Sequence, residues 1–183
     1  GYIVGAGDKV PEALEQMGYE VTLLTEKELE RNNLQQFDAI FAGVRSLNAN
    51  DWMGKYYDKL MTYVEAGGNY IMQYSQANGL RGKIGPVPFA VVNRRITDET
   101  AQVNFLAPQH PVLNFPNKIG ESDFRGWVQE RSLYHAADWD NRFQPVLRMS
   151  DPGEQPQDGS LVIAKHGKGY FTYTGLSFFR QLP

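Results

Sequence analysis

The fold is decided by residues 37–75, FDAIFAGVRSLNANDWMGKYYDKLMTYVEAGGNYIMQYS. This run opens with the apolar segment 37–44 and closes with a second one, 69–75, and both are short enough to be buried strands. Between them, residues 51–66 predict a helix, with Asp51 as a candidate N-cap and Gly67-Gly68 as its stop. Its apolar stripe comprises Met53, Tyr56, Leu60 and Val64. Apolar strands that alternate with a helix predict a parallel sheet covered on both faces.

The same alternation extends upstream. The segment YIVGA (2–6) predicts a first strand, and Pro11 suits the first turn of a helix that Gly18 can close. The segment YEVTLL (19–24) predicts a second strand before the third at 37–44. We therefore predict the α/β class, as a flavodoxin-like three-layer sandwich with a mostly parallel sheet.

Downstream, the regular pattern dissolves over residues 76–142, which five prolines punctuate. Short strand candidates remain at 89–96 and 102–107, and another follows at 144–150. Near the end, SLVIAKH and YFTYTGL flank Gly167-Lys168-Gly169, a signal typical of a β-hairpin. We expect a single domain over residues 1–183, with a long irregular loop layer and a C-terminal β-hairpin.

Composition narrows the function classes. The chain has 183 residues, 42% of them hydrophobic, which suffices for one core. A net charge of −3 argues against binding the phosphate backbone of nucleic acids, and no apolar run is long enough to span a membrane. The absence of cysteine excludes disulfides, thiolate metal sites and cysteine nucleophiles. It leaves both a cytoplasmic and an exported or periplasmic location open. Because the chain opens inside a strand-like run without Met, we expect a piece of a longer protein.

Two strand ends supply candidate ligand-binding residues. GAGDKV (5–10) only partly matches a dinucleotide fingerprint, so we expect a tight turn in which Asp8 lines the crevice, and no NAD. Arg45 and Asn48 follow the strand at 37–44, where the carboxyl ends of parallel strands face a ligand crevice. Arg45 there holds either an anion or polar sugar, or a carboxylate such as Asp51.

The end of the strand at 69–75 suggests further candidates. Gln73, Tyr74 and Asn78 should face the same crevice. Ser75 is the hydroxyl nucleophile available there, and His110, in a loop, is a candidate base for it.

A metal site is a further alternative. Asp98 and Glu99 are neighbours on a loop and could join His110 around a metal, but no ligand spacing indicates such a site and a solvated turn is the favoured interpretation.

SDFRGWVQERSLYHAADWD (122–140) mixes large rings with charged residues and keeps neither strand nor helix periodicity. Stacking rings beside fork-shaped hydrogen-bonding groups are typical of sugar sites, and the same mixture suits a domain interface or a structural cover. For the first alternative, the candidate ligand residues are Trp127, Gln129, Glu130 and Arg131.

Several long stretches carry a resemblance to a known family. They are FDAIFAGVRSLNAN (37–50), YVEAGGNYIMQYS (63–75), IGPVPFAVVNRRITDE (84–99), HPVLNFPNKIGESDFRGWVQERSLY (110–134) and GKGYFTYTGLSFFRQLP (167–183). Together they resemble the carboxyl-terminal region of bacterial PIG-L (LmbE-like) deacetylase-family proteins. The resemblance implies a class I glutamine-amidotransferase-like fold related to ThuA-like domains, which are associated with sugar metabolism. It also implies a deacetylase-like partner domain in the same longer chain.

The family's chemistry does not carry over with the resemblance. The zinc deacetylase motif of the H-P-D-D kind is absent, because His110-Pro111 is followed by Val112-Leu113. The amidotransferase Cys is replaced within Gln73-Tyr74-Ser75, and Ser132 stands where the family pattern leads us to expect Gly. We therefore expect an accessory, non-catalytic domain without a cofactor, which binds a polar or carbohydrate ligand or packs on the deacetylase-like domain. The alternatives are a hydrolase with an atypical site at Ser75 or at Asp98, Glu99 and His110, and a pure protein-interaction module.

Overall fold

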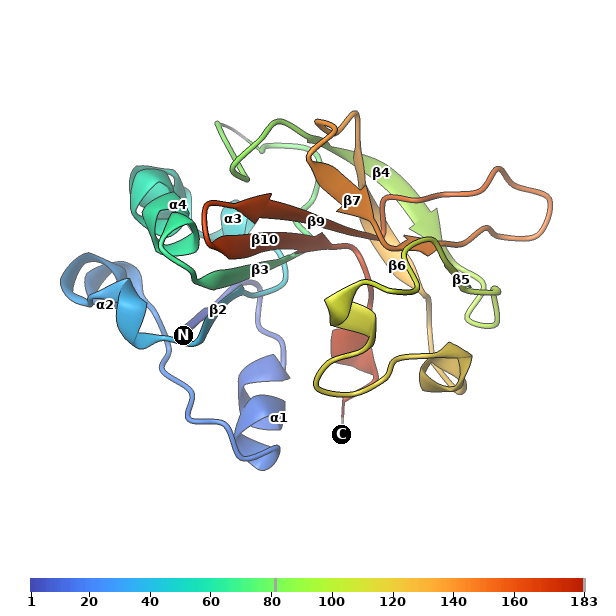
Figure 1. Cartoon of the computed structure of the whole chain (residues 1–183), viewed down its shortest axis with the longest axis horizontal. Coiled ribbons are helices and arrows are strands. Elements are labelled where there is room, and N and C mark those ends of the chain that lie inside the picture. The colour runs from blue at the N-terminus through green and yellow to red at the C-terminus, as the bar shows by residue number, and fades with distance from the viewer. Residues whose placement is uncertain (81, 183) are drawn as a thin grey trace.

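A computed structural model describes residues 1–80 and 82–182. Its centre is a six-stranded sheet in the order β1-β2-β3-β10-β9-β7 (Figure 1). The strands are β1 Tyr2–Ile3, β2 Ala39–Ala42, β3 Asn69–Gln73, β7 Phe143–Pro145, β9 Leu161–His166 and β10 Gly169–Thr174. The four strands β1, β2, β3 and β10 run parallel, whereas β9 is antiparallel to both β10 and β7. The protein is thus a mixed α/β domain with a mostly parallel central sheet.

Few helices cover the sheet. They are α1 Val10–Gln16, α2 Glu26–Arg31, α3 Ser46–Ala49 and α4 Tyr57–Glu65. The 3-10 turns are η1 Leu34–Gln36, η2 Asp51–Tyr56, η3 Pro111–Leu113, η4 Glu121–Phe124 and η5 Phe178–Arg180. Figure 1 shows α2, α3 and α4 gathered at one end of the molecule. Here α4 buries Leu60 and Val64 in the same apolar core as Met72 and Phe171 of the sheet.

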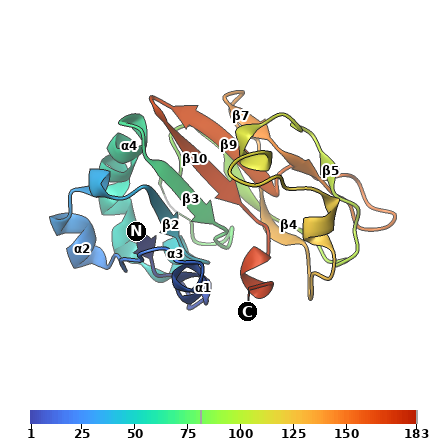
Figure 2. The same cartoon turned by 60° about the horizontal axis from the view of Figure 1, so that its bottom comes forward.

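A second layer lies at the other end of the molecule (Figures 1 and 2). It contains an antiparallel pair, β4 Ala90–Ile96 with β6 Ser132–Ala137, and a shorter pair, β5 Asn104–Phe105 with β8 Leu147–Arg148. Its own apolar core includes Ile96, Phe124 and Leu147, and Ile163 of β9 joins this core from the central sheet. Residues 76–142 therefore contribute to both cores, and the second core is completed by residues 146–149 and Ile163.

The predicted elements are confirmed where the pattern was long. Pro11 lies in the first turn of α1, the stripe of the predicted 51–66 helix is buried, and β9 and β10 form the hairpin around residues 167–169. The hairpin also completes the central sheet, because β10 pairs in parallel with β3. No helix within the described residues is long and apolar enough to cross a membrane.

Three predictions of local structure are wrong. Residues 19–24 form only one bridge, between Leu23 and Tyr2, because Tyr19 and Leu23 stay 62% and 50% exposed and gain no packing there. The helix expected from Asp51 starts as the 3-10 turn η2 and becomes α-helical at Tyr57, without a side-chain cap from Asp51. Residues 132–137, expected to be irregular, form β6, because pairing with β4 buries its backbone.

Candidate functional site

Six separate parts of the chain meet in one cavity at the carboxyl ends of β1, β2 and β3, which we call the crevice cavity. Its volume is about 390 Å³, within the usual range for small-molecule sites. Loops after the three strands, the β4–β6 pair and the C-terminal turn η5 all contribute to it. The lining residues are Ala6, Gly7, Asp8, Val44, Arg45, Tyr74, Arg95, Glu130, Leu133, Tyr134, Phe179 and Arg180. In Figure 2 the C-terminal turn lies on the same side of the molecule as α1, the helix that follows the β1 loop.

Arg45 occupies an elbow between β2 and α3. Its backbone is left-handed, with φ of 58°, and its N–H donates to Tyr74 O at 2.8 Å. A non-glycine residue in this conformation is strained, and such strain gathers at functional sites. The side chain is half-buried against the cavity. Within the described residues the Arg45 guanidinium forms no ion pair, and Asp51, its alternative partner, lines a different cavity.

Asp8 lines the cavity, but its carboxylate is occupied by the fold. Its Oδ1 accepts from the Tyr2 hydroxyl at 2.5 Å and from Val10 N at 3.0 Å, and its Oδ2 accepts from Val44 N at 3.1 Å. Gln73, which is 1% exposed, donates to the same Tyr2 hydroxyl at 3.0 Å. Burial and the Asp8 carboxylate raise the pKa of Tyr2. Asp8, Tyr2 and Gln73 therefore form a buried hydrogen-bond chain that fixes the cavity floor.

An aromatic wall closes one side of the cavity. The Tyr74 ring lies 5.5 Å from that of Tyr134 and 5.9 Å from that of Phe179, centroid to centroid. Tyr134 also has a left-handed backbone, with φ of 52°, and its carbonyl accepts from the Tyr173 hydroxyl at 2.6 Å. Burial raises the pKa of Tyr74, although the nearby Arg180 and Arg45 oppose this shift. Tyr74 is buried in the main core, so the partly exposed rings of this wall are those of Tyr134 and Phe179.

The rim of the cavity is an ion-paired cluster. Arg180 pairs with Glu130 at 3.4 Å and donates to the side-chain carbonyl of Gln129. Gln129 has φ of 72°, and its N–H donates to Glu99 Oε2 at 2.6 Å. Three of the four described non-glycine residues with positive φ, Arg45, Gln129 and Tyr134, thus line or border this cavity. The strain in the fold concentrates around one site.

The remaining predicted ligand residues lie elsewhere. Asn48 braces the loop after β3: its side chain donates to Gln76 O at 3.3 Å and Asn78 O at 3.4 Å, and accepts from Gln76 N at 2.7 Å. Arg131 is 5% exposed and donates to the carbonyls of Ala101 and Phe124. Neither Asn48 nor Arg131 lines the crevice cavity.

Trp127 belongs to the second core. Its ring packs 5.1 Å from the Phe124 ring, and its Nε1 donates to Asp123 O at 2.8 Å. The Arg131 guanidinium lies 5.7 Å from the centre of the same ring. Trp127 and Arg131 therefore pack against the second core, as in the structural-cover alternative. Gln129 and Glu130 lie instead at the rim of the crevice cavity.

The candidate catalytic and metal residues are separated from one another. Ser75 is fully buried and its Oγ has no hydrogen-bond partner within the described residues. His110 Nδ1 accepts from Val112 N at 3.1 Å, and Asp98 accepts from Thr100 N at 2.8 Å. Across residues 1–80 and 82–182, no three His, Asp or Glu side chains gather in a metal-binding arrangement. Within the described residues, Ser75 and His110 therefore form no hydrogen-bonded pair, and Asp98, Glu99 and His110 form no metal site.

Eight lining residues were not among the predicted ligand residues, and the four of these with charged or aromatic side chains are Arg95, Tyr134, Phe179 and Arg180. Tyr134 and Arg95 lie on the paired strands β6 and β4, and the other two on η5. One sequence signal pointed to Arg95: Arg94 and Arg95 are adjacent in a strand candidate, and successive residues of a strand face opposite sides, so one of the two should face inward. No local pattern, however, connects η5 to the end of β3.

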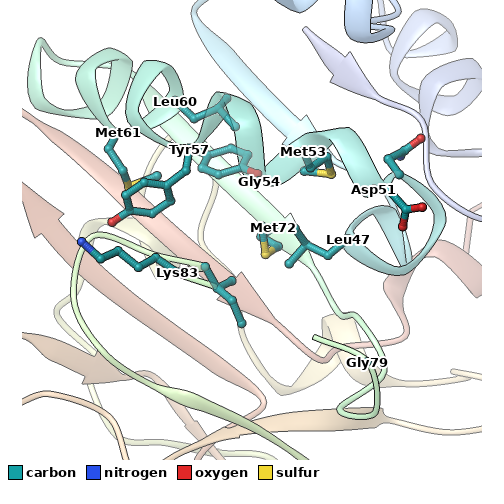
Figure 3. Close-up of a pocket in the computed structure, with 13 residues that line it drawn as sticks. Leu47, Asp51, Met53, Gly54, Tyr57, Leu60, Met61, Met72, Gly79 and Lys83 are labelled. Atoms are coloured by element: carbon teal, nitrogen blue, oxygen red, sulfur yellow. The ribbon is translucent and has the colours of Figure 1, made fainter. Parts of the chain in front are cut away.

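A second cavity, of about 520 Å³, lies on the α4 side of the sheet (Figure 3) and is named the helix-side cavity. Figure 3 shows Met53, Met61 and Met72 converging on it, with Lys83 reaching across from the loop after β3 and Asp51 at the far end. Tyr70 also lines it, and its buried hydroxyl has no hydrogen-bond partner among the described residues. The walls are largely core side chains.

Comparisons with known proteins support the fold alone. No family model matches the chain, and no curated protein matches it in sequence. Cytoplasmic protein STM3548 from Salmonella typhimurium has a similar structure, with 15% identity over 96% of this chain and 81% of that chain, and a TM-score of 0.55. A β-galactosidase from Rahnella sp. R3 is similar with 17% identity over 90% of this chain and 23% of that chain, and a TM-score of 0.54. Cytoplasmic protein STM1381 from Salmonella typhimurium LT2 has 14% identity over 93% and 78% of the two chains, with a TM-score of 0.53.

Proposed function

We propose that this protein is a non-catalytic binding domain that holds a small saccharide or similar polar ring ligand in the crevice cavity. The fold is proposed to be a flavodoxin-like, glutamine-amidotransferase-like sandwich, and the domain to accompany a PIG-L-type deacetylase-like domain of a longer protein. The observation that carries the proposal is Arg45. It combines a strained backbone with a guanidinium that faces the cavity and forms no ion pair within the described residues.

The chemistry of the cavity supports a polar ring ligand. Tyr134 and Phe179, which pack against buried Tyr74, are partly exposed aromatic side chains against which the apolar face of a sugar ring can lie. Arginine side chains supply several donors in a fixed geometry for hydroxyl or carboxylate oxygens. A few converging polar groups beside aromatic walls are the usual composition of a small-molecule site.

The state of the nucleophile candidate supports binding rather than catalysis. A serine nucleophile needs a base within hydrogen-bond reach. Among the described residues Ser75 has no such partner, and His110 uses Nδ1 to accept from Val112 N. The proposal of an accessory role agrees with the β-galactosidase neighbour, in which the similar region is 23% of a longer chain.

A second candidate function is an interaction module, which one exposed surface favours. Met17 and Tyr19 are 61% and 62% exposed, and they line a cavity of about 560 Å³ with Phe41 and Ile71 of the sheet. Large apolar side chains exposed together mark contact surfaces. A deacetylase-like domain of the same chain is the partner that the sequence resemblance implies.

The experiment that tests the binding proposal is a calorimetric titration with a panel of neutral, amino and acidic monosaccharides. We expect at least one saccharide to bind, and Arg45→Gly to weaken it at least tenfold. Because glycine adopts φ of 58° without strain, Arg45→Gly should keep or raise the free energy of unfolding, by up to about 1 kcal/mol. Trp127→Ala is the contrasting variant: it should destabilise the second core yet leave binding by the folded protein intact. Absence of binding to every saccharide, or binding unchanged by Arg45→Gly, would overturn the proposal.

A further inference from the structure

We infer that the ligand of the crevice cavity is an anionic saccharide, a sugar acid or sugar phosphate, whose charged group is bound by Arg45 and Arg95. This inference rests on the proposed function and specifies the chemical class of its ligand. Its basis is the distribution of charge inside the cavity, which differs from that of the chain as a whole.

The cavity has a surplus of positive charge although the chain carries −3. Its lining contains three arginines, Arg45, Arg95 and Arg180, and two carboxylates, Asp8 and Glu130. Both carboxylates are already used by the protein: Asp8 accepts three hydrogen bonds from Tyr2, Val10 and Val44, and Glu130 pairs with Arg180. The single ion pair leaves two guanidinium groups without one, and three arginines against two carboxylates give the lining one net positive charge.

Arg45 and Arg95 are those two groups. Within the described part of the chain, neither guanidinium forms an ion pair, and the recorded side-chain hydrogen bonds include neither of them. They reach the cavity from different elements, the β2–α3 elbow and β4. An anion bound in this cavity would therefore be attracted by two guanidinium charges that no ion pair in the described residues occupies. A carboxylate or phosphate matches their donor geometry.

The aromatic wall defines the remainder of the ligand. A free inorganic anion would use the two arginines but would make no use of the partly exposed rings of Tyr134 and Phe179. A ring that bears the anionic group can lie against this wall while its charge is held by the arginines. The cavity of about 390 Å³ has the size of a small-ligand site.

The test compares matched probes on the whole 183-residue chain by calorimetry: glucose, glucuronate, glucose 6-phosphate and inorganic phosphate. We expect the tighter-binding of the two anionic sugars, glucuronate and glucose 6-phosphate, to bind at least tenfold more tightly than glucose. Comparing these two sugars shows whether the cavity prefers a carboxylate or a phosphate. Arg95→Gln should weaken that anionic sugar at least fivefold. Arg95 is exposed, so the variant should fold.

Arg94→Gln provides the matched control. Arg94 is the preceding residue of β4, removes the same charge when substituted, and contacts Gln157 at 3.4 Å outside the cavity. It should change the affinity less than twofold. If glucose binds as tightly as both acidic sugars, the anion inference is overturned while the proposed function stands. If inorganic phosphate binds as tightly as glucose 6-phosphate and glucuronate does not bind, the saccharide assignment is overturned. If no probe binds, both proposals fall.

Discussion

The two cavities on either side of β3 differ in how their side chains are held. Around the crevice cavity the backbone is strained at Arg45 and Tyr134, and two arginines form no ion pair within the described chain. Around the helix-side cavity the walls are unstrained core residues such as Met53 and Met72, and the unpartnered polar atom is the Tyr70 hydroxyl. A space left by imperfect packing needs no strained backbone, because its lining residues keep ordinary conformations. The strained backbone is therefore the reason for proposing the crevice cavity, rather than the helix-side cavity, as the binding site.

Alanine substitutions at two glycines, one beside each cavity, should give the largest difference in folding stability between the two cavities. A Cβ at Gly5 would lie 2.0 Å from Val44 O, a backbone atom beside Arg45, whereas a Cβ at Gly54 would meet nothing within 4 Å. We expect Gly5→Ala to lower the free energy of unfolding by about 2–3 kcal/mol and to abolish ligand binding. Gly54→Ala should change stability by less than about 0.5 kcal/mol. Urea unfolding of both variants checks this, and equal losses would contradict the difference between the cavities.

The strand that carries Tyr134 should also make stability depend on pH. His135 is 1% exposed, its Nε2 lies 2.8 Å from Ser132 Oγ, and burial lowers its pKa to about 4. In the unfolded chain its pKa is about 6.5, so as pH falls the unfolded state takes up the proton first. The contribution of neutral His135 is fully present above about pH 6.5 and is lost as pH falls from there towards 4.

Between pH 7 and pH 5 this loss should be about 2 kcal/mol. Urea unfolding at both values measures it, and His135→Gln should remove that part of the pH dependence. The remaining histidines, His110 and His166, are present in both proteins, so the difference between them isolates His135. An equally steep pH dependence in His135→Gln would show that another group is responsible.

A pair of buried tyrosines on adjacent strands should give a smaller contrast. The Tyr173 hydroxyl donates to Tyr134 O at 2.6 Å behind the crevice cavity, whereas the Tyr70 hydroxyl beside the helix-side cavity has no described partner. Tyr173→Phe should lower the free energy of unfolding by about 1 kcal/mol. It should also weaken ligand binding, because the backbone of Tyr134 loses a hydrogen bond that holds it in place. Tyr70→Phe should be neutral or stabilising, by up to about 1 kcal/mol. Thermal unfolding and calorimetry compare the two, and a larger loss for Tyr70→Phe would contradict the assignment.

The predictable part of the site lies on the parallel strands. Asp8, Arg45 and Tyr74 were predicted because parallel strands place their carboxyl ends at one edge of the sheet. Glu130 was predicted from the unusual mixture of rings and charges in residues 122–140. Trp127 and Arg131 come from the same stretch but lie in the second core, because residue type alone does not state which way a loop side chain faces.

The sequence by itself determined the α/β class, the helix that becomes α4 and the terminal hairpin. These follow from the spacing of apolar residues along short segments, and that spacing distinguishes a helix from a strand without knowledge of distant contacts. Only the tertiary structure decided that β10 pairs with β3, that residues 132–137 form a strand, and that Arg95 and Arg180 join Arg45. These are contacts between residues far apart in the chain, and they depend on how two cores pack together. The strained backbone at Arg45 is of the same kind, since a left-handed arginine persists only where its surroundings enforce it.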